Sequence, residues 1–401
     1  MNLKFPVLTA ALIFFTMLPV TMIVPVFKEI IKDRLGGNNL AVSYFMSIAM
    51  LGSFLFSPVA GYVSDRIRSR KWLISVFAVL DGISLISLTF TRDLYVLQAL
   101  RFAEGAFHIF VIGLLLALMA DRENDPNNTR FYRKGIILGT AGTFLTLGVG
   151  LGSPMGILGK KNPDLPFIIA GIIMIFIGIV SSLFLKDYEF QFHKKVTLDT
   201  WKAAYRNNPL VVIPCIYNFI DRFTVGFFVS IFSLHLREDL HLNPGQTGLL
   251  LSFVLIPMSL CSYPFAVISR KTNPALWMMT GSVIYGAALG SAGFAENNYV
   301  LAFLLLVCGI GAGVMFVPSM MLVSRLVPQE LNATAMTVYT GIGSIGFMLG
   351  PISAVLLDET VFSSLQKDIR FGSLALFFGM LEILTVITTL PFYHRLQEKK
   401  I

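Results

Sequence analysis

The sequence has little charge for its length. Only 13% of its 401 residues are Asp, Glu, Lys or Arg, whereas 55% are hydrophobic. An ordinary soluble domain carries about 25% charged residues. The shortage of charge therefore excludes a soluble globular protein and indicates a membrane protein.

Cysteine and several catalytic motifs are also scarce or absent. The three cysteines, Cys215, Cys261 and Cys308, fall inside apolar stretches, so we expect no disulfide framework. No G-x-x-x-x-G-K-[ST] loop occurs, so ATP is not the expected energy source. H-E-x-x-H and G-x-S-x-G are missing as well. We therefore expect no enzyme, no cofactor and no metal.

Long apolar runs are what the sequence has in their place. A helix needs about 20 apolar residues to cross a bilayer core of about 30 Å. Twelve such runs occur, at residues 6–27, 40–63, 72–90, 94–119, 134–158, 166–185, 209–234, 245–268, 275–294, 299–323, 332–356 and 371–392. They predict an all-α membrane protein with twelve transmembrane helices.

The basic residues follow the sides of the membrane that these helices define. With a cytoplasmic amino terminus, 20 of the 31 Lys and Arg residues lie in inward segments. This asymmetry agrees with the positive-inside rule and places both termini in the cytoplasm. Because the net charge of +8 follows membrane topology, we expect no nucleic-acid partner. The plasma (inner) membrane is the expected location.

Two internal similarities divide the chain into halves. "SPVAG" at 57–61 resembles "YPFAV" at 263–267, and "GVGLGSPMG" at 148–156 resembles "GFMLGPISA" at 346–354. Duplicated halves are typical of secondary transporters. We predict two pseudo-symmetric six-helix bundles, residues 1–185 and 209–401, joined by a cytoplasmic linker at 186–208.

The loop "GYVSDRIRSRKW" at 61–72 adds a family resemblance. Its Gly61, Asp65, Arg66, Arg70 and Lys71 resemble the signature G-x-x-x-D-R-x-G-R-[RK] of the major facilitator superfamily. The segment "RFAEG" at 101–105 is similar to the family's R-x-x-Q-G, and the glycines and proline of helix five resemble its antiporter motif. The loop departs from the signature, because Arg68 replaces its glycine. Helix five inserts Ser153 before Pro154.

The resemblance implies a gate on the cytoplasmic side. The aspartate that Asp65 matches accepts hydrogen bonds from the amino end of helix eleven when that side is closed, which a helix dipole favours. Gly61 would permit close helix approach, and Arg66 or Arg70 would pair with an acid such as Asp121. The alternative is that the basic residues only fix topology.

A second set of residues is expected where helices pack closely and bend. Glycine removes side-chain bulk and proline removes a backbone donor. These residues lie in helices five and eleven and are Gly148, Gly152, Pro154, Gly350 and Pro351.

Charges inside the apolar runs are the candidates for function, because each costs about 2.5 kcal/mol or more at a helix centre. Arg101, Glu104 and His108 share one face of helix four, since they are three and four residues apart. Arg101 and Glu104 could instead form a static ion pair, and His108 could be a core residue.

Helix seven carries the second candidate group, Asn218, Asp221 and Arg222. Adjacent side chains project about 100° apart, so Asp221 or Arg222 should find a partner on another helix, although Asp221 could be a static partner. The resemblance places helices four and seven beside a central cavity. Asp81 and Glu382 fall on helices that it places peripherally, where a structural or lipid-edge role is expected.

The expected function is proton-coupled export of a small organic solute by antiport. Burial favours a protonated carboxyl group and a nearby arginine opposes this, so Glu104 and Asp221 could exchange protons. The alternatives are a proton symporter or facilitative uniporter of a polar or zwitterionic metabolite, and a non-transporting receptor or scaffold. The expected partners are the solute, protons and the lipid bilayer, and we expect a monomer.

Overall fold

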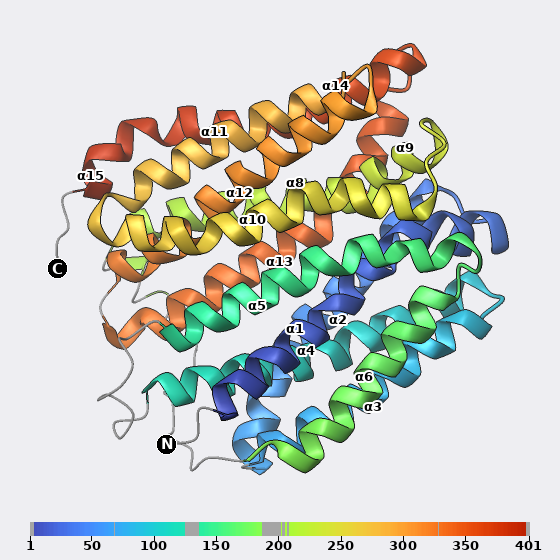
Figure 1. Cartoon of the computed structure of the whole chain (residues 1–401). Coiled ribbons are helices and arrows are strands. Elements are labelled where there is room, and N and C mark those ends of the chain that lie inside the picture. The colour runs from blue at the N-terminus through green and yellow to red at the C-terminus, as the bar shows by residue number, and fades with distance from the viewer. Residues whose placement is uncertain are drawn as a thin grey trace. The chain divides into compact units, whose positions relative to one another are not determined.

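The chain is helical throughout the part that the structure describes. The computed structural model describes residues 4–67, 69–124, 136–186, 202, 205–206, 208–327 and 329–397. Within these residues every regular element is a helix, and twelve segments are long and apolar enough to cross a bilayer (Figure 1). Each segment overlaps one of the twelve apolar runs, so the predicted fold class is confirmed. A helix satisfies its backbone hydrogen bonds internally, as lipid requires.

The chain forms two compact units, which we call unit 1 and unit 2. Unit 1 comprises Met1–His193 with Leu236–Ser252, and unit 2 comprises Lys194–His235 with Phe253–Ile401. The predicted boundaries at residues 185 and 209 remain predictions, because most of the intervening linker lies outside the described residues.

Unit 1 contains the first six membrane-spanning segments. Its α3 packs along α6 and α4, α2 packs along α4, and α1 packs along α5; Figure 1 shows α3 and α6 side by side. The elements in chain order are α1 (Lys4–Met22), η1 (Val24–Val26), η2 (Lys28–Arg34), α2 (Asn39–Ile67), α3 (Arg70–Phe90), α4 (Leu94–Asn124), α5 (Ile136–Gly152), η4 (Ser153–Lys160) and α6 (Leu165–Phe184).

Unit 2 contains most of the remaining six segments. Its α11 packs against α12 and α14, and α8 packs along α13. The elements in chain order are η5 (Pro209–Val211), α8 (Val212–Phe227), η6 (Phe228–Phe232), α9 (Ser233–Glu238), α10 (Pro244–Lys271), α11 (Pro274–Ala292), α12 (Asn298–Leu326), α13 (Gln329–Thr360), α14 (Lys367–Thr389), η7 (Leu390–Phe392) and α15 (Tyr393–Gln397).

The end of α9 and the start of α10 belong to unit 1 and are held there by ion pairs. Arg237 pairs with Glu29, and Lys32 Nζ lies 2.5 Å from Glu238 Oε1. Gly248 packs directly on the backbone of η4. These contacts explain why Leu236–Ser252 clusters with unit 1.

Two glycines fix the position of the helices that carry the charges of unit 1. A Cβ added at Gly105 of α4 would collide with the backbone of Ala49 in α2. A Cβ at Gly82 of α3 would lie 2.5 Å from the carbonyl oxygen of Gly171 in α6. Small residues allow such close backbone approach in membranes. The residues next to these glycines, Glu104 and Asp81, are consequently held at defined positions.

The start of α4 and the core of unit 2 show how sequence fixes local structure. Asp93 caps α4, since its carboxylate accepts hydrogen bonds from the backbone N–H groups of Tyr95 and Val96 at 2.8 and 2.9 Å. In unit 2, Phe227 of α8 stacks on Phe378 of α14 with ring centroids 4.5 Å apart.

All three cysteines are free, as expected.

Candidate functional site

The polar face of α4 forms a buried ion pair. Arg101 Nη1 donates to Glu104 Oε2 at 2.5 Å, and both side chains are buried. The guanidinium also lies over the ring of Phe45 from α2, 4.9 Å from its centroid. Because the pair is removed from water and joined by a charge-assisted hydrogen bond, loss of either partner would leave an uncompensated charge.

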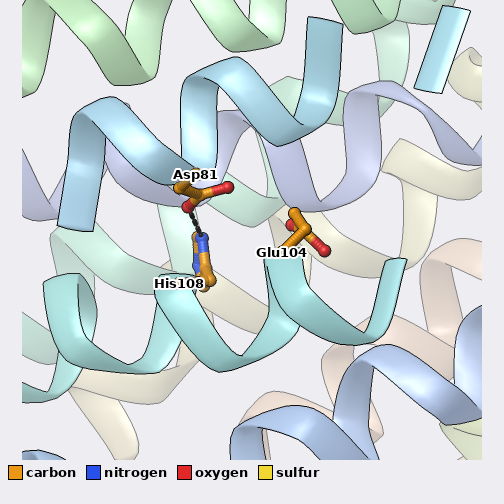
Figure 2. Close-up of side chains that lie close together, drawn as sticks. All are labelled: Asp81, Glu104 and His108. Carbon is orange, nitrogen blue, oxygen red and sulfur yellow. Dashed lines mark hydrogen bonds and ion pairs between the residues drawn. The ribbon is translucent and has the colours of Figure 1, made fainter. Parts of the chain in front are cut away.

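His108 lies one turn further along the same face and pairs with α3. Its Nδ1 is 2.9 Å from Asp81 Oδ2, and Asp81 is completely buried. Figure 2 shows Asp81 reaching from α3 toward His108 and Glu104 on α4. The structure therefore joins His108 to a carboxylate that sequence reasoning left out of the site.

The lipid-edge interpretation of Asp81 is wrong. It followed from the place of helix three in the family architecture, but Asp81 lies on the face of α3 that packs inside unit 1. Ile74, Ala78 and Leu85, which are seven, three and four residues from Asp81, share that buried face. The sequence carries no strong signal of this orientation, because the outward face of α3 is apolar as well.

Several polar atoms of this group have no hydrogen-bond partner among the described residues. They are Asp81 Oδ1, His108 Nε2 and Arg101 Nε, all of which are shielded from solvent. Asp81, Glu104 and His108 each bring one ligand atom within 4.8 Å of the others, which is close enough for the three to share one metal ion. Arg101 already balances the charge of Glu104, which disfavours a divalent cation there.

In unit 2, the three predicted residues of α8 also lie together. Asp221 is buried and its Oδ2 is 3.6 Å from Arg222 Nε. The side chains of Asp221 and Arg222 therefore approach each other, although their Cα–Cβ bonds project about 100° apart around the helix axis. The Arg222 guanidinium lies over the ring of Phe316 in α12, 4.8 Å from its centroid, and Asn218 Nδ2 donates to the Tyr339 carbonyl of α13 at 2.6 Å.

A small cavity adjoins these residues inside unit 2. Its volume is about 10 Å³, close to the space that one water molecule needs. The lining combines polar groups from α8, α12 and α13 with apolar side chains, and consists of Tyr217, Asn218, Asp221, Met278, Met315, Phe316, Ser319 and Tyr339. Asp221 Oδ1 has no hydrogen-bond partner among the described residues, and Asp221 is one of the residues that line this small cavity of mixed polar and apolar side chains.

Glu382 of α14 is the second acid that sequence reasoning placed elsewhere. It is completely buried, so a lipid-edge position is wrong for it too. Ser282 of α11 donates to its Oε2, and Thr224 of α8 lies 3.4 Å from its Oε1. Thr224 also contacts the Tyr285 hydroxyl at 3.1 Å. Hydroxyl groups from two helices therefore surround this carboxyl group.

The residues of the predicted cytoplasmic gate are only partly described. Arg70 is buried, and Arg66 is exposed with its Nη1 3.3 Å from the Tyr62 hydroxyl. The side chains of Asp65 and Asp121 lie outside the described residues, and so do the pairs predicted for them.

Gly61 makes no close helix contact within the described part of unit 1, and its approach to another helix in the gate stays a prediction. A Cβ built there would meet no described atom within 4 Å, and Gly61 is exposed. Within unit 1, its lack of a side chain is therefore not required for packing.

The glycines of the predicted packing motif lie at helix contacts. Gly148 and Gly152 face the backbone of α1, where an added Cβ would collide with carbonyl oxygens. Gly350 meets α8 in the same manner. Helix five changes from α to 3₁₀ geometry at Ser153, one residue before Pro154, whereas Pro351 lies inside the continuous α13.

Among the described residues, twelve helices are long and apolar enough to cross a membrane and both units bury charged residues, which indicates a multi-pass membrane protein. The sequence profile of the Major Facilitator Superfamily matches residues 9–232 and 214–400. The chain belongs to this superfamily, and its function is that of a superfamily transporter. A search of curated proteins finds no significant match.

Solved structures with the same fold cover nearly the whole chain. A point mutant of the nucleoside transporter NupG is 12% identical, covers 96% of this chain and 99% of its own, and has a TM-score of 0.80. Unmutated NupG is 13% identical with full coverage of both chains and a TM-score of 0.76. A bacterial homologue of the human lysosomal transporter Spinster, inward-facing and unoccupied, is 14% identical, covers 98% and 96%, and has a TM-score of 0.72. These likenesses show the fold and do not support assignment to the drug/proton antiporter branch.

Proposed function

We propose that this transporter couples the movement of a small organic solute to protons and exports the solute by antiport. The observation that carries the coupling is the burial of acids beside arginines in both units, Glu104 with Arg101 and Asp221 with Arg222. Such groups are costly in a membrane interior unless they have partners or a function. A carboxylate with a cation beside it can change its proton occupancy when its access to water changes.

The export direction is supported by the run of glycines and Pro154 in helix five. This run resembles the antiporter motif, and its glycines pack against α1. We also propose that the protein lies in the plasma membrane as a monomer, with both termini in the cytoplasm. Asp65 keeps its proposed role as a cytoplasmic latch.

A second candidate is uptake of a polar or zwitterionic metabolite by proton symport or facilitated diffusion. It is favoured by Asp221, which lines the small cavity of unit 2, has an Oδ1 without a hydrogen-bond partner among the described residues, and lies beside the cation of Arg222. An acid beside a base suits a solute that carries both charges. NupG, a nucleoside transporter by its name, has the same fold, which keeps polar metabolites among the solutes to be tested.

The test is transport by purified protein in liposomes with an imposed pH gradient. A panel of labelled amphipathic compounds, nucleosides and zwitterionic metabolites is offered on either side. Antiport predicts that solute moves against the proton flow and accumulates above its equilibrium concentration, and that a protonophore abolishes the accumulation. Accumulation in the direction of proton flow would establish symport in place of antiport.

Two further outcomes separate the remaining classes. Movement only down the solute gradient, unaffected by the protonophore, would establish a facilitative uniporter. Binding of a compound with no movement under any gradient would favour a receptor or scaffold. Protein-free liposomes and liposomes with heat-denatured protein control for leakage.

A further inference from the structure

Four side chains at the contact of α3 and α4 form one electrostatic unit, which we call the α3–α4 cluster. They are Asp81 from α3 and Arg101, Glu104 and His108 from α4. The charged groups that act on His108 are the other three members, while α2 contributes the ring of Phe45. The charge of this cluster can therefore be counted from these four residues.

The count shows a deficit of one positive charge. Two carboxylates and one guanidinium give a net charge of minus one when His108 is neutral. An uncompensated charge in a low-dielectric interior costs several kcal/mol. One added proton brings the cluster to neutrality, whereas a divalent cation would leave it at plus one. The count thus favours a single proton over a metal ion.

The geometry identifies the atom that takes this proton. A carboxylate on Nδ1 fixes the histidine tautomer, so that Nδ1–H donates to Asp81 Oδ2, 2.9 Å away. Nε2 then carries no proton and has a free lone pair, and it has no hydrogen-bond partner among the described residues. Glu104 lies one turn earlier on the same helix face, with ligand atoms of Asp81, Glu104 and His108 within 4.8 Å of one another. It offers a negative charge to the new N–H.

We propose that the α3–α4 cluster binds one exchangeable proton at His108 Nε2, and that Asp81 and Glu104 hold it there jointly through their charge. Binding converts the neutral imidazole to imidazolium without breaking the bond to Asp81, and release returns the proton to water. The proposal rests on the proposed proton coupling and places the proton of unit 1 on His108, in the contact between α3 and α4. Arg101 fixes the number of protons at one, because it neutralises one of the two acids.

The test is infrared difference spectroscopy of the protein in liposomes, with ring-labelled histidine, as the pH is lowered. The chain has five histidines, so His108→Gln identifies the band of His108. Asp81→Asn and Glu104→Gln each remove one negative charge with little change of shape. The matched control is Asp93→Asn at the exposed start of α4, where asparagine also serves as a helix cap.

The expected result is an imidazolium band that appears in the wild type and is absent in His108→Gln. In both Asp81→Asn and Glu104→Gln the cluster is neutral without the proton, so the band should be lost from the pH range in which the wild type gains it. Asp93→Asn should match the wild type. Loss of the band in Glu104→Gln is the decisive result. Glu104 makes no hydrogen bond to His108 among the described residues, so it acts on His108 through its charge.

Three results would overturn the proposal. The first is the absence of a His108 band in the wild type, and the second is wild-type behaviour of either acid variant. The third is a histidine signal that changes only when Zn²⁺ is added and reverts with a chelator, which would establish a metal site. The spectrum requires no transport, so a titrating His108 in a protein without proton-driven transport would refute the coupling and leave the proton site standing. Proton-driven transport without a His108 band would refute the proton site on His108 and leave the proposed coupling standing.

Discussion

Among the described residues, units 1 and 2 each bury two carboxyl groups and surround them differently. In unit 1, Glu104 pairs with the guanidinium of Arg101, and Asp81 pairs with the imidazole of His108. In unit 2, Glu382 has two hydroxyl groups and makes no ion pair among the described residues. The remaining acid, Asp221, lies 3.6 Å from an arginine whose side chain is 26% exposed.

The groups that neighbour each carboxyl group indicate which role that carboxyl group can serve. A hydroxyl group satisfies a hydrogen bond without changing charge, so the surroundings of Glu382 suit a fixed structural role. An imidazole can gain or lose a charge near neutral pH, so the surroundings of Asp81 suit proton exchange. Asp221 borders a small cavity with room for about one water molecule, which suits contact with water.

The largest expected effect is that of Arg101→Ala. It leaves Glu104 buried without its cation, which should lower the free energy of unfolding by about 3–5 kcal/mol. Arg222→Ala should cost less, because this side chain is only partly buried and its Nε lies 3.6 Å from Asp221, against 2.5 Å in the pair of Arg101 with Glu104. Melting temperatures of both variants in one detergent measure the difference. Equal destabilisation would remove the distinction between the two pairs.

The next effect concerns coupling. Glu104→Gln and Asp221→Asn should each reduce solute accumulation driven by a pH gradient to background, because net transport needs proton transfer. Exchange of labelled for unlabelled solute at equal concentrations should persist, since it needs only the moving protein. Transport assays in liposomes measure both quantities. Full accumulation by both variants would leave facilitated diffusion as the better description.

A smaller effect is expected from the glycines that position the clusters. Gly105→Ala forces a methyl group against the backbone of α2 and should cost about 1–3 kcal/mol. At Gly343 the atoms nearest to an added Cβ belong to the side-chain amide of Asn218, which can move more easily than a backbone. The cost there should be the loss of one hydrogen bond, about 1 kcal/mol. Thermal unfolding of the two variants side by side would show whether backbone contact is the stronger constraint.

The smallest effect is expected from Glu382→Gln. The amide keeps an acceptor and gains a donor for the hydroxyl groups of Ser282 and Thr224. Stability should change by about 1 kcal/mol or less, and transport per folded molecule should match the wild type. Loss of proton-driven accumulation in this variant would contradict the contrast between Glu382 and the acids of unit 1.

Part of the site follows from local helix geometry. The pairing of Arg101 with Glu104 is expected from a spacing of three residues, and the structure shows it. The same periodicity places His108 on that face but does not supply its partner. Asp81 is 27 residues away on another helix, and Ser282 lies 100 residues from Glu382.

The sequence by itself determined the twelve spans, because the need of a helix for about 20 apolar residues in lipid is a local property of composition. Local spacing also determined which charges share a face of one helix. Only the tertiary structure decided that Asp81 and Glu382 point inward. The rotation of a transmembrane helix about its axis depends on packing with its neighbours, and the backbone contacts at Gly82 and Gly105 set that packing for α3 and α4. An apolar run surrounded by apolar lipid carries no strong signal for that rotation.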